Sequence, residues 1–198
     1  MTNQATTKSV LRREMRNQIR AQNAAEIARA SEKIAANLAS FLKTSPRKFQ
    51  RAAVYLATPR EANVDAFARQ LQARGVLLCA PHSRENEKPF LPINADWSNI
   101  SRNARGWREP EYSDDSPLSA EEIDLILVPA LAFDATGARL GQGGGWYDRA
   151  LKNLPAKVLT IGVAFDFQIV EFVPREAHDQ TVSMIVSDAR IIQPIRES

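Results

Sequence analysis

A short apolar run, Asp-Leu-Ile-Leu-Val-Pro at residues 124–129, is the clearest candidate for a buried β-strand in this chain. Its apolar residues are continuous and do not alternate with polar ones, which is typical of a strand in a parallel sheet covered on both faces. Comparable apolar runs occur at residues 52–57, 76–80, 158–164 and 182–186. These five runs predict the strands of one sheet.

A helical stretch at residues 64–74 lies between the runs at 52–57 and 76–80, and Gly75 follows it as a helix-ending residue. This order predicts a β-α-β unit, which joins two parallel strands through a covering helix. Residues 81–120 contain five prolines, and we expect only short strands and loops there. The prediction is a three-layer α/β/α domain with a mostly parallel central sheet.

Two helices are predicted before the sheet, at residues 8–23 and 24–42, from the spacing of their apolar side chains. The whole chain, residues 1–198, is then expected to form a single domain. Its N-terminal helical region spans 8–45, and its α/β core spans 52–198. A chain of this length with 44% hydrophobic residues can bury such a core.

Composition narrows the class of protein. The sequence has no apolar run long enough for a membrane span and no signal peptide, so we expect a cytoplasmic protein without a membrane partner. The single cysteine, Cys79, stands in an apolar run and is predicted to be a buried thiol. Two histidines and one cysteine are too few for a structural zinc site, so any metal should be oxygen-ligated, such as Mg²⁺. The net charge of +3 is concentrated near the N-terminus.

Residues 139–149 read Arg-Leu-Gly-Gln-Gly-Gly-Gly-Trp-Tyr-Asp-Arg and hold four of the eight glycines in the chain. We call residues 141–145 the glycine loop. Glycine permits positive φ and close approach of backbone N–H groups to a ligand, and a helix predicted from Trp146 to Lys152 would add further unpaired N–H groups. The spacing matches neither the P-loop nor the dinucleotide fingerprint. A phosphate site and a plain loop both remain open.

A basic row at four-residue spacing, Lys8, Arg12, Arg16 and Arg20, marks one face of the first helix. Lys8 and Arg12 suit a phosphate clamp over the glycine loop, and the face as a whole also suits a solvated surface or a nucleic-acid contact. Acidic candidates have two interpretations as well. Asp148 suits either a magnesium ligand or an acid in the first turn of a helix. Glu61, just past a strand end, suits either a ligand contact or the surface.

Taken together, these residues resemble the 5-formyltetrahydrofolate cyclo-ligases, also called methenyltetrahydrofolate synthetases. The strongest similarity runs from Asp124 to Arg149. Further similarities span nearly the whole chain: Lys8 with Leu11 and Arg12, Tyr55-Leu56 followed by Glu61, Pro81, Glu109-Pro110, Ala164-Phe165 with Gln168, and Pro174 followed by His178-Asp179.

The resemblance implies a NagB/RpiA/CoA-transferase-like fold and an ATP- and Mg²⁺-dependent enzyme. Such an enzyme converts 5-formyltetrahydrofolate to 5,10-methenyltetrahydrofolate with release of ADP and phosphate. The formyl oxygen is a poor leaving group, so its phosphorylation would precede attack by N10 of the folate and ring closure. Positioning and charge neutralisation would then be the main tasks of the protein.

The resemblance also implies roles for particular residues. Catalytic roles fall to Arg139, Tyr147 and Asp148. ATP would be bound by Lys8, Arg12, Arg139, Gly141, Gln142, Gly143, Gly144, Gly145, Trp146 and Tyr147. Leu56, Glu61, Trp146 and Tyr147 would contact the folate. Asp148 and Asp179 would hold Mg²⁺.

Four positions depart from the family pattern. Ala130 stands where a glycine is common, and Trp146 replaces a tyrosine or phenylalanine. Gln142 and Gly144 lack the positive charge that some members carry in the loop, which would weaken phosphate binding unless Arg139 compensates.

The predicted partners are ATP and 5-formyltetrahydrofolate, with or without a polyglutamate tail, and a monomer without nucleic acid is expected. Two alternatives stay open. One is a noncatalytic nucleotide- or RNA-binding module that uses the basic N-terminal helix. The other is an enzyme of the same class that acts on another amide-like substrate.

Overall fold

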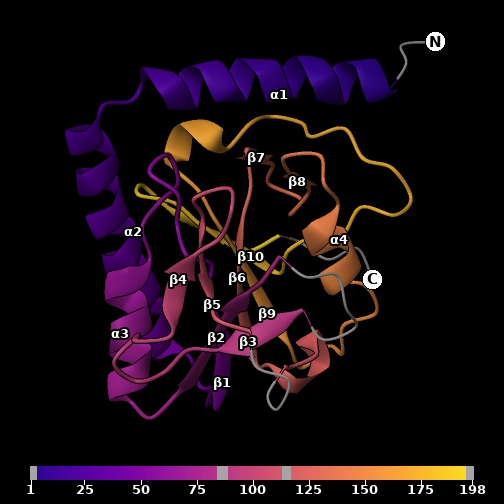
Figure 1. Cartoon of the computed structure of the whole chain (residues 1–198). Helices are drawn as coiled ribbons and strands as arrows, with labels where there is room; N and C mark the ends of the chain where they lie inside the picture. The colour runs from indigo at the N-terminus through magenta and orange to yellow at the C-terminus, as the bar shows by residue number, and fades with distance from the viewer. Residues whose placement is uncertain (1–3, 84–88, 113–116, 195–198) are drawn as a thin grey trace.

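The computed structural model describes residues 4–83, 89–112 and 117–194 (Figure 1). The predicted helices and strands are present, with additional short elements. In chain order they are α1 (Gln4–Ala21), α2 (Ala24–Thr44), β1 (Arg51–Ala53), α3 (Asp65–Ala73), β2 (Leu77–Pro81), β3 (Phe90–Pro92), β4 (Ile100–Arg102), β5 (Arg108–Pro110), the 3₁₀ turn η1 (Ala120–Glu122), β6 (Leu125–Pro129), β7 (Ala132–Phe133), β8 (Arg139–Leu140), α4 (Trp146–Ala150), β9 (Leu159–Val163), the 3₁₀ turn η2 (Asp166–Gln168), β10 (Met184–Val186) and β11 (Ile191–Ile192).

The main sheet has seven strands in the order β11-β10-β9-β6-β1-β2-β3. Its five central strands, from β10 to β2, are mutually parallel, while the edge strands β3 and β11 are antiparallel to their neighbours. The run that begins at Leu125 is β6, the middle strand of the sheet. The predicted mostly parallel sheet with preceding helices is therefore confirmed.

The strand order reverses direction between β1 and β6. From β1 the chain moves outward to β2, and then it returns to the other side of β1 to form β6, β9 and β10. Connections leave the carboxyl ends of β1 and β6 in opposite directions, so a crevice forms there, and ligands of open α/β sheets bind at such a crevice.

Helices cover the two faces of the sheet unequally. α2 and α3 pack on one face through a large core cluster that includes Leu38 and Phe67, both fully buried. The opposite face is covered by α4, η1 and connecting segments, and its cluster centres on the fully buried Phe133. The third layer of the predicted sandwich is thus built from short elements, because α4 has only five residues and ends before the predicted Lys152.

α1 runs across the end of the sheet next to the β7–β8 hairpin (Figure 1). The apolar face of α1 supplies Met15 and Ile19 to a third core cluster, together with Leu131, Leu140 and Val173. This packing fixes which side of α1 faces the protein. No described helix has both the length and the apolar character that a membrane span requires.

Two short hairpins complete the fold. β4 pairs with β5 inside the proline-rich middle region, where short strands were predicted, and β7 pairs with β8 just before the glycine loop, where none was predicted. The predicted burial of Cys79 is confirmed, and burial raises the pKa of its thiol far above the ordinary value. Such a thiol is protonated at neutral pH and is not a nucleophile.

Gly162 in β9 allows a close contact with Phe133. A Cβ at this position would lie 2.5 Å from the Phe133 ring, which is fully buried. We expect Gly162→Ala to lower the free energy of unfolding by about 1–3 kcal/mol, because the ring has no room to retreat. Urea denaturation measures this. Gly144→Ala is the control, since a Cβ there meets nothing within 4 Å. Equal stability of Gly162→Ala and the wild type would contradict the prediction.

Candidate active site

A cavity of about 240 Å³ opens at the carboxyl ends of β1, β6 and β9. The segment after β1 lines it through Tyr55, Thr58 and Glu61, and the end of β6 contributes Pro129. Arg16 of α1 and Gln142 of the glycine loop also line it. The cavity therefore lies at the crevice that the strand order predicts, with the first helix and the glycine loop at its border.

The glycine loop adopts a backbone that needs glycine at two positions. Gly143 has a φ of 109° and Gly145 a φ of 66°, both in the left-handed region that other residues avoid. At Gly141 a Cβ would lie 2.9 Å from Nη1 of Arg139, so a larger residue there would displace this guanidinium. Gly145 then starts α4 as its N-cap, so the prediction that the glycines open a helix is confirmed.

The basic row of α1 faces the loops of the site. Lys8 is buried, and its Nζ lies 2.6 Å from Oδ2 of Asp179. One turn later, Nε of Arg12 donates to the carbonyl of Gly141 at 3.1 Å. After another turn, Nη2 of Arg16 donates to the carbonyl of Gln142 at 3.0 Å. Three successive turns of the helix thus contact the loops of the site.

Arg139 is buried beneath the glycine loop and forms an ion pair with Asp148. Only 3% of its side chain and 20% of the Asp148 side chain are exposed. Its guanidinium carbon lies 5.8 Å from the centre of the Tyr147 ring. The Nε of Arg139 is buried without a hydrogen-bond partner among the described residues. An unsatisfied donor of this kind, next to a glycine loop, suits an anionic acceptor.

One of the two acids predicted to bind a metal contacts the chain next to the other. Oδ1 of Asp148 accepts a hydrogen bond from the backbone N–H of Gln180, the neighbour of Asp179, at 3.2 Å. In the described part of the chain, no group of three or more acidic, histidine or cysteine side chains forms a metal site. Mg²⁺ usually binds one or two carboxylates together with phosphates and water, so this pair fits Mg²⁺ bound with a nucleotide.

The pKa of Asp179 is lowered below its ordinary value. Partial burial acts in the opposite direction, but hydrogen bonds from Lys8 and from the backbone N–H of Glu176 outweigh it. The carboxylate form is therefore strongly favoured at neutral pH. Glu176 also lies 3.4 Å from Lys8, so a single lysine is shared by two acids.

Two tyrosines lie close to Glu61. Burial and the negative charge of Glu61 raise the pKa of Tyr55 and of Tyr147 well above the ordinary value. Both phenols are therefore neutral at physiological pH and can donate hydrogen bonds. Tyr55 already donates to the carbonyl of Ala62 at 2.6 Å. Glu61 itself accepts a hydrogen bond from the backbone N–H of Thr58 at 2.9 Å, which holds its carboxylate at the cavity.

Trp146 and Leu56 pack against neighbouring side chains away from the cavity lining. Trp146 packs edge-on against Phe90 and Tyr147, with ring centres 5.4 and 4.7 Å apart. Leu56 is 8% exposed and belongs to the main core cluster. Neither lines the cavity, so their predicted contacts with a substrate stay predictions.

Sequence reasoning assigned no site role to Arg16, Gln180 or Tyr55. Arg16 continues the spacing of Lys8 and Arg12, so the four-residue period could have revealed it. For Gln180 and Tyr55 the sequence holds no comparable signal. The first acts through its backbone N–H, and the second faces the cavity only because the chain turns after β1.

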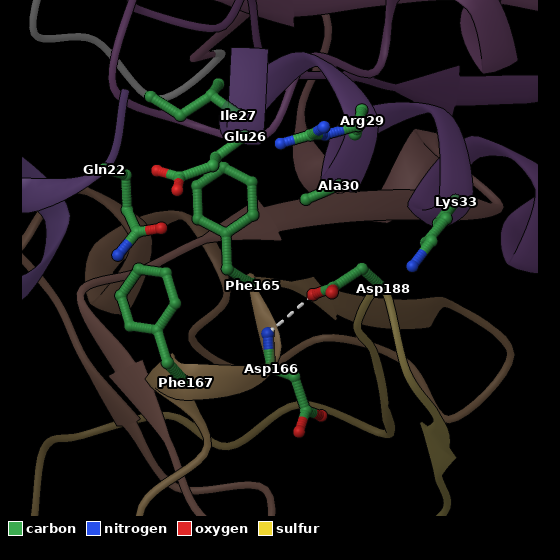
Figure 2. Close-up of a pocket in the computed structure, with 10 residues that line it drawn as sticks. All are labelled: Gln22, Glu26, Ile27, Arg29, Ala30, Lys33, Phe165, Asp166, Phe167 and Asp188. Atoms are coloured by element: carbon green, nitrogen blue, oxygen red, sulfur yellow. Dashed lines mark hydrogen bonds between the residues drawn. The ribbon is translucent and has the colours of Figure 1, made fainter. Parts of the chain in front are cut away.

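A second cavity of about 260 Å³ lies between α2 and η2 (Figure 2). Its border contains Arg29, Lys33 and the stacked rings of Phe165 and Phe167, but none of the predicted site residues. Asp166 there pairs with Arg190 at 2.8 Å, away from the glycine loop. The candidate active site is therefore the cavity beneath α1.

Known proteins are similar in sequence to this chain. A relative from Mycolicibacterium smegmatis, named 5-formyltetrahydrofolate cyclo-ligase, is 31% identical over 147 residues, which cover 72% of this chain and 75% of the relative. A mouse protein of the same name is 25% identical over 91% of this chain and 93% of its own length.

Solved structures share its fold. The 5,10-methenyltetrahydrofolate synthetase of Aquifex aeolicus aligns with a TM-score of 0.79 and 30% identity, covering 96% of this chain and 94% of that one. The family model for 5-formyltetrahydrofolate cyclo-ligases matches residues 4–188, which include α1, the glycine loop and both acids. The chain therefore belongs to the 5-formyltetrahydrofolate cyclo-ligase family.

Proposed function

We propose that the cavity beneath α1 performs the ATP-dependent conversion of 5-formyltetrahydrofolate to 5,10-methenyltetrahydrofolate. One observation carries this assignment. Gln142 of the glycine loop lines the same cavity as Glu61, at the strand crossover where open α/β sheets bind ligands. A phosphoryl donor and its acceptor can therefore meet there. Membership of the cyclo-ligase family names the two substrates.

ATP is assigned to the glycine loop. Arg12 and Arg139 contact or adjoin the loop at Gly141, and Lys8 lies one turn before Arg12 on α1. Positive charges of this kind hold phosphates through short, charge-assisted hydrogen bonds. The bare backbone of residues 141–145 allows phosphate oxygens to approach its N–H groups. The buried Nε of Arg139, which lacks a partner among the described residues, supports an anionic ligand.

The folate is assigned to the cavity. Glu61 supplies a carboxylate that can accept hydrogen bonds from the N–H groups of a pterin ring, and neutral Tyr147 lies near it. Apolar lining from Ile19 and Leu131 suits a flat heterocycle. Leu56, which the family resemblance assigns to the folate site, lies in the core cluster behind these lining residues.

Mg²⁺ is assigned to Asp148 and Asp179, which would hold it together with the ATP phosphates. When bound, Mg²⁺ neutralises the charge that builds on the phosphates during transfer. In the ligand-free protein Asp148 contacts Arg139 and Asp179 contacts Lys8.

The reaction requires the formyl oxygen to become a leaving group. That oxygen attacks the γ-phosphorus of ATP, the bond from phosphorus to the β,γ-bridging oxygen breaks, and ADP leaves. N10 then attacks the activated formyl carbon and loses its proton as the ring closes and phosphate departs. The task of this chain is to align the two substrates, keep water away and stabilise the transferred negative charge.

Further details belong to the same proposal. A monomeric enzyme is part of this proposal. A cytoplasmic location agrees with the single, buried cysteine. A polyglutamate tail on the folate is compatible with the basic surroundings of the cavity, where Arg20 and Arg60 stand.

The purified protein should form 5,10-methenyltetrahydrofolate from its 5-formyl precursor only when ATP and Mg²⁺ are both present. We expect one ADP for each methenyl product, because one phosphoryl group activates one formyl oxygen. Absorbance of the methenyl chromophore and coupled ADP detection measure this. Chelation by EDTA should stop the reaction, and excess Mg²⁺ should restore it. Product formation without ATP, or none with it, would refute the proposed function.

Asp148→Asn should lower kcat/KM by at least about 100-fold, because it removes one proposed magnesium ligand and the ion-pair partner of Arg139. Asp65→Asn is the matched control, since Asp65 also pairs with an arginine, Arg108, at 2.8 Å and is similarly exposed. The control should keep its activity. Steady-state rates of methenyl formation by the two variants measure this difference. A fully active Asp148→Asn enzyme would exclude the metal role.

Lys8→Gln should raise the KM for ATP about tenfold or more, because a charge-assisted contact to phosphate contributes about 1.5–3 kcal/mol. Lys33→Gln on the exposed side of α2 serves as control. Initial rates at varied ATP concentration measure the effect, with a thermal melt of each variant to confirm folding. An unchanged KM in a folded Lys8→Gln protein would remove Lys8 from the ATP site.

A further inference from the structure

Arg16 stands at the border between the two proposed substrate positions. Its guanidinium group contacts the glycine loop through the carbonyl of Gln142 at 3.0 Å and the side-chain oxygen of Gln142 at 3.3 Å. The same side chain lines the cavity that contains Glu61. Arg12, one turn earlier, contacts the loop at Gly141 but does not line this cavity.

The charges around the site distinguish Arg16 from Lys8 and Arg139. Lys8 and Arg139 are each compensated by a carboxylate, Asp179 and Asp148. Within the described part of the chain, Arg16 contacts neutral oxygen atoms and no carboxylate. Its positive charge is therefore available to an anion without first breaking an ion pair. The guanidinium fork suits the oxygens of a phosphoryl group.

The glycine loop has no basic side chain of its own, because residues 141–145 read Gly-Gln-Gly-Gly-Gly. The positive charge beside Gln142 comes instead from α1, because Arg16 forms hydrogen bonds with Gln142. Since α1 packs on the protein through Met15 and Ile19, on either side of Arg16 in sequence, this cation is held by a packed helix.

We propose that Arg16 is a catalytic residue that stabilises the γ-phosphoryl group as it passes from ATP to the formyl oxygen. This inference rests on the proposed function. During transfer, the bond from the formyl oxygen to phosphorus forms while the bond from phosphorus to the β,γ-bridging oxygen breaks, and ADP leaves. Negative charge spreads over the three remaining phosphoryl oxygens, and Arg16 binds them without gaining or losing a proton.

Four variants test the role. Arg16→Gln should lower kcat by about 100-fold while changing the KM for ATP and for the folate less than about threefold, because the contact forms mainly in the transition state. Arg16→Lys keeps a charge without the fork and should be intermediate. Arg13→Gln, on an exposed arginine of the same helix, should match the wild type. The double variant Arg16→Gln, Gln142→Arg moves the cation to the loop, and its kcat should be at least about tenfold higher than that of Arg16→Gln alone.

Initial rates of methenyl formation, together with calorimetric titration of ATP, separate this role from a structural one. If Arg16 only holds α1 on the loop, Arg16→Gln will weaken ATP binding and raise its KM, and Gln142→Arg will not restore kcat. That outcome, or an unchanged kcat, overturns the inference. If Arg16→Gln fails to fold, the Arg16→Lys variant decides through its kcat. A wild-type protein without product overturns the proposed function and the Arg16 role with it.

Discussion

The attachment of α1 to the glycine loop is the contact on which the candidate site depends. Arg12 and Arg16 donate to successive carbonyls of the loop, at Gly141 and Gln142, while Lys8 is buried against Asp179. Apolar packing of the adjacent side of the helix, through Met15 and Ile19, fixes its rotation, so that Lys8, Arg12 and Arg16 face the site. Without this helix, the cavity at the carboxyl ends of β1 and β6 would lose one of its borders.

Paired charges stabilise the ligand-free arrangement. A buried cation is costly unless it is compensated, and Lys8 and Arg139 are compensated by Asp179 and Asp148. In the proposed function, a nucleotide with its metal brings charges of both signs, so each cation can turn to a phosphate and each acid to the metal. The same residues can thus keep the site folded and prepare it for its ligands. Arg16 differs, because it contacts neutral groups.

The sequence predicted the main architecture because buried strands and amphipathic helices follow from local patterns. The run at Leu125–Pro129 became the central strand, and the helices at the N-terminus extend to within a few residues of their predicted bounds. Two-residue strands leave no such pattern, so the β7–β8 hairpin was missed. The length of α4 was overestimated, because residues 151–152 have helical composition but continue as a turn.

By itself, the sequence determined the fold class, the glycine loop and, through its similarity to one family, the candidate residues. These are properties of contiguous segments, where spacing and composition carry the information. The tertiary structure alone decided which residues meet: Lys8 with Asp179, across 171 positions, and Arg16 with Gln142, across 126. The physical reason is that such pairs depend on how α1 packs across the strand ends, and that packing is fixed by side chains distant in sequence.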